Sequence, residues 1–235
     1  MKFKIIFLGI LCISLASYGQ HDKFDQILQK NVSNKGIVSY KAMLAQKSDL
    51  TSYINYLKTT SPDESWSKDR EKAFWMNAYN AYTILLIVEN YPVKSILKIQ
   101  KNGKDAWHQN FAVVGGVSYT LNQIEHEILR KKFSDPRIHV GVNCASYSCP
   151  ALPNYAFTEQ NVDAKLQVLM KDFINDPSRN LITVKKVTLS KIFEWYKEDF
   201  TKNGSLIAYI NTYTDLVLSK KTKVRYMEYN WNLNE

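Results

Sequence analysis

The chain has 235 residues, of which 45% are hydrophobic, and a formal net charge of +9. Its 31 Lys and Arg residues are scattered and form only short pairs, such as Lys185-Lys186, so the basic stripe typical of nucleic-acid-binding proteins is lacking. The sequence has no internal repeat and no low-complexity tract, which excludes repeat and low-complexity architectures.

The N-terminus has the pattern of a secretory signal: residues 1–4 are basic, 5–15 apolar, and small residues follow. We expect cleavage near Gly19 and Gln20, with Cys12 removed in the signal. The apolar run is too short for a typical membrane-spanning helix, and no later segment of the sequence is long and uncharged enough to span a membrane. We therefore expect an exported protein, periplasmic or secreted, with no membrane span. Its remaining 216 residues, 20–235, carry a charge of +7 and form one domain.

Residues 22–32 and 41–58 predict two helices. Residues 68–89 are apolar around most of the helix circumference, which predicts a buried central helix that ends before Pro92. Asn77 and Asn80 share one face of that helix, and both need hydrogen-bond partners once buried. We expect these amides to tie down a neighbouring loop, and Asn77 is also a candidate to orient a catalytic histidine.

Residues 111–120 predict a β-hairpin, because the intervening Gly115 and Gly116 can both adopt positive φ. A helix follows over about 122–131, and Glu125 lies on its apolar face, where a carboxylate needs a partner. His126 projects about 100° around the helix from Glu125, so the two side chains should not serve one site in the same way.

Residues 137–142 alternate between apolar and other side chains, which predicts a strand with Arg137 and His139 on one face. Cys144 follows just past its end. A rigid strand fixes such a side chain while the connecting backbone opens toward a substrate, so this position suits catalysis.

Further elements are predicted at residues 159–174 (helix), 181–184 and 186–189 (extended), 190–200 and 205–218 (helices), and 224–231 (a strand and packed tail). We expect Phe193, Trp195, Tyr196 and Phe200 to belong to the core, with a groove for sugar or peptide as the alternative. The whole pattern indicates an α+β fold. Several helices surround the buried central helix, beside a small, mostly antiparallel sheet that includes one hairpin.

Four motifs resemble, in the same order, those of a bacterial and plant family known as domain of unknown function 547. They are Phe74–Ala81, Leu121–Arg130, Asp135–Pro150 and Leu189–Tyr196. The resemblance extends from about Phe24 to the tail Tyr229-Asn230-Trp231, where the family more usually has aspartate in place of Asn230. It supports the fold and implies no substrate or reaction.

One hypothesis is a thiol hydrolase or acyltransferase with Cys144 as its nucleophile. We expect Cys144 at the first turn of a short helix, whose dipole and N–H groups would favour a thiolate and an oxyanion. His126 or His139 would be the base, oriented by Glu125 or Asn77.

His139 would lie about 16 Å from Cys144 if the chain were extended at roughly 3.3 Å per residue, so His126 is the freer candidate. The candidate binding residues are Asn80, Asn143, Arg137 and Cys149. The expected ligand is a small-molecule or peptide-like compound of the cell envelope.

A second hypothesis is a noncatalytic envelope binding or structural module in which Cys144 and Cys149 form a disulfide. A regular helix would hold their Cα atoms roughly 8 Å apart, which is too far, whereas a turn permits the bond. A third hypothesis adds His126 and His139 to the cysteines as zinc ligands, but their spacing matches zinc motifs poorly, so we expect no metal and no cofactor. His21 and His108 have no motif around them and are expected on the surface.

Overall fold

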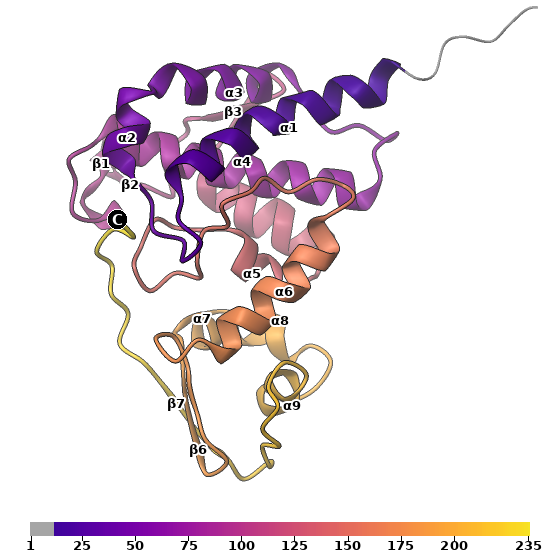
Figure 1. Ribbon diagram of the computed structural model, residues 1–235, viewed down its shortest axis with the longest axis vertical. Coiled ribbons are helices and arrows are strands. Elements are labelled where there is room, and N and C mark those ends of the chain that lie inside the picture. Colours follow the sequence, from indigo (N-terminus) through magenta and orange to yellow (C-terminus); the bar gives the residue numbers. More distant parts are fainter. Residues whose placement is uncertain (1–11) are drawn as a thin grey trace, which may run out of the picture.

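The helices of the N-terminal half build one end of the molecule, and a small sheet with short helices builds the other (Figure 1). The computed structural model describes residues 12–235. The first four helices are α1 (Cys12–Asn31), α2 (Tyr40–Ala45), α3 (Lys47–Thr59) and α4 (Lys68–Glu89). The helix predicted at 68–89 is confirmed, the one predicted at 22–32 is the C-terminal part of the longer α1, and the one predicted at 41–58 is divided at Gln46. Residues 1–11 of the predicted signal lie outside the described residues, and no described helix is long and apolar enough to span a membrane.

The strands of residues 12–235 form three small sheets. The strands are β1 (Gln100–Lys101), β2 (Lys104–Asp105), β3 (Ala112–Val114), β4 (Val117–Tyr119), β5 (Leu181–Ile182), β6 (Lys186–Leu189) and β7 (Lys223–Tyr226). The predicted glycine-turn hairpin is β3–β4, with Val114 opposite Val117. The β1–β2 and β5–β6 pairs are also antiparallel, and only β6–β7 is parallel among the described strands. The α+β prediction with mostly antiparallel pairing is confirmed.

Most of the remaining helices are shorter than the predicted ones, and the short helix η1 was not predicted. They are η1 (Ile96–Lys98), η2 (Gln123–Phe133), α5 (Ile138–Gly141), α6 (Val162–Asn175), α7 (Ile192–Trp195), α8 (Lys197–Thr201) and α9 (Leu206–Asn211). The predicted helix at 122–131 is η2, a π-helix, which is a form often found at functional sites. The helix predicted at 190–200 is divided at Tyr196 into α7 and α8.

The strand predicted at residues 137–142 is wrong, because this segment contains the short helix α5. Alternation indicates a strand only when one face meets solvent, and all four residues of α5 are buried. The overlooked signal is Asp135 before Pro136. The Asp135 carboxylate accepts the backbone N–H of Arg137 at 3.0 Å, as a residue at a helix start does.

Helix α5 packs tightly because it ends in glycine. A Cβ atom on Gly141 would lie 1.8 Å from Met76 Cε and 2.9 Å from Leu166 Cδ2. Only a residue without a side chain therefore lets α5 approach α4 and α6 this closely. This close packing sets the position of His139 and of the chain that follows.

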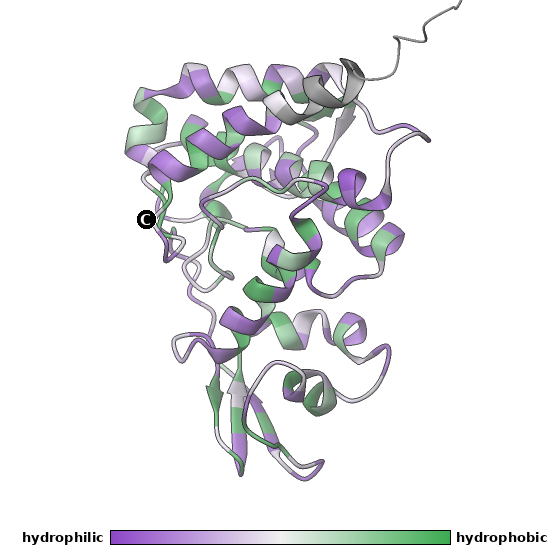
Figure 2. Ribbon diagram, turned by 45° about the vertical axis from the view of Figure 1, so that its right-hand side comes forward, coloured by the Kyte–Doolittle hydropathy of each residue, from purple (hydrophilic) through white to green (hydrophobic). Residues whose placement is uncertain are grey.

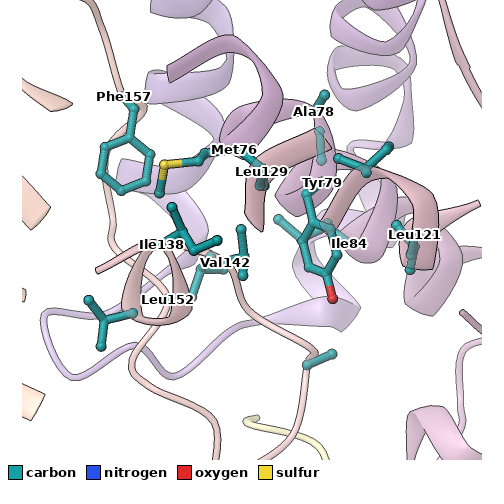
Figure 3. Close-up of a cluster of buried hydrophobic side chains, with 14 of the residues drawn as sticks. Met76, Ala78, Tyr79, Ile84, Leu121, Leu129, Ile138, Val142, Leu152 and Phe157 are labelled. Carbon is teal, nitrogen blue, oxygen red and sulfur yellow. The ribbon is translucent and has the colours of Figure 1, made fainter. Parts of the chain in front are cut away.

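Helix α4 is the centre of the core, as predicted. All but one of the residues from Lys72 to Val88 are buried, and buried apolar side chains from Phe24 to Leu233 form one continuous cluster. Figure 3 shows Met76 of α4 beside Phe157, with Ile138 and Val142 close by. In Figure 2, hydrophobic residues gather where the helices meet, whereas the peripheral loops are mostly hydrophilic.

His21 does not lie on the surface, so that expectation is wrong, whereas His108 is exposed. The His21 Nδ1 atom lies 3.0 Å from the Tyr53 hydroxyl and 3.2 Å from Asn77 Nδ2. Burial, aided by the positive charge of Arg70, lowers the pKa of His21 to about 4. The folded protein therefore holds this imidazole neutral.

Stability should fall as the pH drops from about 6.5 to about 4. The unfolded chain takes up a proton on His21 in this range while the folded chain does not, which costs about 3 kcal/mol in free energy of unfolding. Urea unfolding at several pH values measures this loss. The His21→Gln variant should show a flatter pH dependence, and His108→Gln should match the wild type. An unchanged slope in His21→Gln would contradict the assignment.

Candidate active site around Cys144

Residues 143–150 form an irregular loop, here called the cysteine loop, and not the helix start expected at Cys144. Asn143 closes this loop on itself. Its Oδ1 accepts the Ala145 N–H at 2.7 Å, and its Nδ2 donates to the Pro150 carbonyl at 2.8 Å. Ala145 has a φ of +59°, a left-handed conformation that such local hydrogen bonds help to hold.

Asn80 attaches the cysteine loop to α4. Its Oδ1 accepts the Asn143 N–H at 2.9 Å, and its Nδ2 donates to the Gly141 carbonyl at 2.8 Å. Asn80 and Asn143 were predicted as binding residues, and their amides are committed to the loop backbone. The expectation that the α4 asparagines tie down a neighbouring loop is met at Asn80.

The C-terminal tail, residues 227–235, runs alongside the cysteine loop. The Tyr147 N–H donates to the Asn232 carbonyl at 2.7 Å, and the Ser148 N–H donates to the Asn230 carbonyl at 3.1 Å. The Asn230 side chain accepts the Asn232 N–H at 3.0 Å, a contact that an aspartate oxygen would also make. This pairing brings Tyr229 against Cys144.

Three neighbours surround the Cys144 sulfur. Cys149 Sγ lies at 3.1 Å, Ser146 Oγ at 3.0 Å and the Tyr229 hydroxyl at 3.4 Å. The hydrogen bond between the Cys144 and Cys149 sulfurs has the largest effect and lowers the pKa of Cys144 to about 7, although burial acts in the opposite direction. Cys149 itself is buried, and burial together with the adjacent Cys144 raises the pKa of its thiol. Side-chain donors thus favour the Cys144 thiolate, in place of the expected helix dipole.

Both cysteines face a cavity of about 100 Å³. Its polar lining includes Glu125, His139, Cys144 and Cys149, all of which the sequence had marked. Its aromatic lining comprises Tyr79, Trp107, Trp195, Tyr196, Tyr229 and Trp231. Of the predicted aromatic groove, Trp195 and Tyr196 line this cavity, whereas Phe193 and Phe200 are buried in the core.

His139 is the histidine at the cavity. Its Nε2 atom lies 2.7 Å from Asp199 Oδ2, and its ring stacks on Tyr196 with 3.8 Å between ring centroids. In the neutral tautomer with its hydrogen on Nε2, the carboxylate accepts that hydrogen and Nδ1 carries the lone pair. His139 Nδ1 is buried and has no hydrogen-bond partner among the described residues.

The sequence analysis did not identify Asp199 as a site residue. It lies on α8, 60 residues from His139, with no local motif around it. Arg130 donates to both of its oxygens, at 2.7 and 3.0 Å. Burial would raise the pKa of Asp199, but the hydrogen bonds from His139 and Arg130 outweigh it and hold this carboxyl well below its usual range.

Glu125 and His126 have different surroundings, as the helix geometry predicts. Glu125 Oε1 accepts the Tyr196 hydroxyl at 2.7 Å beside the cavity. His126 is held by Arg130, whose guanidinium lies 3.0 Å from Nδ1, and burial lowers the pKa of His126. His126 is not among the residues that line the cavity, so His139 replaces it as the candidate base.

Asn77 and Arg137 also lie apart from the cavity lining, like His126, Asn80 and Asn143. Asn77 pairs with the Phe157 backbone, with its Oδ1 accepting the N–H at 2.9 Å and its Nδ2 donating to the carbonyl at 2.8 Å. Arg137 forms ion pairs with Asp135 at 2.9 Å and Asp163 at 2.6 Å. The polar groups of Asn77 and Arg137 therefore hold the backbone at Phe157 and the side chains of Asp135 and Asp163.

Other parts of the described chain offer less chemistry. No group of three or more His, Cys, Asp or Glu side chains within residues 12–235 is arranged to hold a metal ion. A larger hollow of about 320 Å³ lies against α1, α2 and α3, but its lining contains no cysteine or histidine. The cavity at Cys144 is therefore the candidate active site.

The middle of the chain, which supplies α4, η2 and the cysteine loop, matches a known family. Residues 64–174 match the model of a family described as protein of unknown function, DUF547. The chain resembles the DUF547 family. Three of the four motifs lie within the DUF547 match, and Leu189–Tyr196 lies beyond it. No curated protein and no solved structure matches the chain.

Alkylation of Cys144 in the reduced protein should reach half its maximal rate near pH 7, because only the thiolate reacts and its fraction rises with pH. Removing the Cys149 donor in Cys149→Ala should move this midpoint up toward about 8.5, the value of an ordinary thiol. Iodoacetamide labelling followed by mass spectrometry measures both. Ser146→Ala serves as the matched control with a smaller upward shift. A midpoint that does not move in Cys149→Ala would show that Cys149 does not activate Cys144.

Proposed function

We propose that the protein is an exported cysteine-centred hydrolase or acyltransferase in which the Cys144 thiolate is the nucleophile and His139 is the base. The observation that carries this proposal is the shared cavity, into which both the Cys144 sulfur and the Asp199-bound imidazole open. The signal pattern at the N-terminus supports export. The substrate class is a small or peptide-like acyl compound of the cell envelope.

In the first step, Cys144 Sγ attacks the carbonyl carbon of a bound acyl compound. Negative charge then develops on the carbonyl oxygen, and donors placed beside it lower the barrier. The hydroxyls of Ser146 and Tyr229 adjoin the sulfur and serve this purpose. Collapse of the tetrahedral intermediate expels the leaving group and leaves a thioester on Cys144.

His139 moves the protons in both halves of the reaction. Asp199 fixes the ring through Nε2 and stabilises the imidazolium that forms. Nδ1 first takes up the proton that the Cys144 thiol gives up on forming the thiolate, and donates it to the leaving group. It then removes a proton from the incoming water or acyl acceptor that cleaves the thioester, and this proton returns to the released Cys144 sulfur. The order of these groups in the chain differs from papain-like enzymes, since the base precedes the nucleophile.

An activated ester such as p-nitrophenyl acetate should produce a burst of product and an acyl group on Cys144. Cys144→Ala should abolish both. His139→Gln should slow turnover by about 10²- to 10⁴-fold, the usual contribution of a general base. Stopped-flow absorbance and peptide mass spectrometry measure these effects.

His126→Gln is the matched control, because His126 is held by the same Arg130–Asp199 pair but does not line the cavity. Turnover in this variant should stay within a few-fold of the wild type. Equal losses in His126→Gln and His139→Gln, or the same acylation in unfolded protein, would argue against the proposed site.

The alternative function is a noncatalytic envelope binding or structural module with a Cys144–Cys149 disulfide. The 3.1 Å separation of the two sulfurs favours it, because the loop is a turn and not the regular helix that would hold them apart. The intact mass of the unreduced protein would then be two hydrogens lower than that of the reduced protein. A disulfide that persists under native reducing conditions would support this alternative.

A further inference from the structure

The two cysteines are arranged so that a bond between them needs little movement. Their sulfurs are 3.1 Å apart, and a disulfide has an S–S length of about 2.05 Å, so an approach of about 1 Å suffices. The Cys144 N–H donates to Cys149 Sγ at 3.2 Å, and the Cys149 N–H donates to the Ser146 carbonyl at 3.1 Å. These hydrogen bonds aim the Cys149 sulfur at Cys144.

The two thiols have unequal access to solvent. Cys144 is partly exposed at the cavity, whereas Cys149 is only 4% exposed. The pKa of Cys144 is lowered by the Cys149 thiol, and burial raises that of Cys149. The Cys144 sulfur is therefore the more accessible to an incoming compound, and the nearly enclosed Cys149 sulfur adjoins it. In acyl transfer Cys149 only lowers the pKa of Cys144 through its hydrogen bond, so no bond to the Cys149 sulfur itself is formed or broken.

The surrounding backbone is held whether or not the sulfurs are bonded. Asn143 joins both ends of the cysteine loop, and Asn80 anchors it to α4. The tail pairs with Tyr147 and Ser148 from the other side. None of these contacts uses a sulfur atom, so the loop does not depend on a disulfide to keep its shape.

We propose that Cys144 and Cys149 form a dithiol–disulfide couple that exchanges with low-molecular-weight disulfides, as a second activity of this cavity. It goes beyond the proposed acyl transfer, since it requires Cys149. The Cys144 thiolate attacks one sulfur of a disulfide RSSR, forming a mixed disulfide and releasing RS⁻.

The second half of the exchange consumes Cys149. Its thiol passes its proton to the released RS⁻, which leaves as RSH, and its sulfur attacks Cys144 Sγ. The Cys144–Cys149 bond forms, and the second RS⁻ is expelled. The protein dithiol loses two electrons, and RSSR gains them as it becomes two thiols; excess thiol reverses the sequence.

The cavity favours small disulfides with apolar or aromatic substituents. It measures about 100 Å³, and Trp195, Tyr229 and Trp231 stand close together beside the sulfurs, with 4.5 to 5.8 Å between ring centroids. Aromatic walls bind flat or apolar groups through stacking and burial.

The test uses the full mature chain, reduced with dithiothreitol and desalted, and mixed with dithiodipyridine. The wild type should release two thiopyridones per protein and end with Cys144 bonded to Cys149. Cys149→Ser should release one and remain as a mixed disulfide on Cys144, and Cys144→Ser should release none at a comparable rate. Circular dichroism checks the fold of each variant. In the wild type, release of two thiopyridones with a final mass two hydrogens below that of the reduced protein shows the internal disulfide without any variant, whereas two thiopyridyl groups left on the protein would overturn the inference.

A wild type that stops at the mixed disulfide, or whose disulfide cannot be reduced in the native state, overturns the inference. Glutathione disulfide is the second probe, with rates normalised to those of free cysteine. It should react at least ten-fold more slowly than dithiodipyridine, and an equal normalised rate overturns the assignment of the cavity as the binding site. Ester acylation of Cys144 is measured in a separate experiment. Disulfide exchange without acylation contradicts only the proposed function. Acylation without disulfide exchange contradicts only this inference.

Discussion

The hydrogen bonds of Asn80 and Asn143 hold the backbone from which the site is built. The cysteine loop has no regular structure, yet Asn143, Ala145 and Ser146 are buried, and each unpaired backbone group in such surroundings costs about 1–3 kcal/mol. Asn80 supplies partners from α4, and Asn143 supplies them from within the loop. Because α4 is packed on nearly all sides, the loop inherits the rigidity of the core.

A second set of contacts, centred on the Asp199 carboxylate, connects the cavity to helices η2 and α8. Asp199 binds Arg130 and His139 together, and Arg130 in turn contacts His126. A carboxylate in this partly buried position is tolerable because a guanidinium pairs with it in a bidentate manner. The two histidines thus share one ion pair but differ in access, and only His139 opens to the cavity. His126 and His139 therefore differ in role because of where their side chains lie relative to the cavity, although both are histidines.

Sequence patterns located the elements that carry a strong periodic signal. The continuous apolar circumference of residues 68–89 and the paired glycines at 115–116 led directly to α4 and the β3–β4 hairpin. The strand predicted at residues 137–142 was wrong, because alternation over six residues indicates a strand only when one face is exposed, and this segment is buried. His21 misled because a lone histidine carries no local sign of its environment. Its burial follows from contacts with α3 and α4.

The sequence by itself determined that the chain is α+β, that α4 is its buried centre, and that two cysteines and a histidine gather in one short segment. These features follow from local propensity and from hydrophobic period, which neighbouring residues set. Only the tertiary structure decided which groups meet. Asp199 reaches His139 across 60 residues, Tyr196 reaches Glu125 across 71, and Tyr229 reaches Cys144 across 85. Such pairs depend on how α8, η2 and the tail pack together, and no local pattern records that packing.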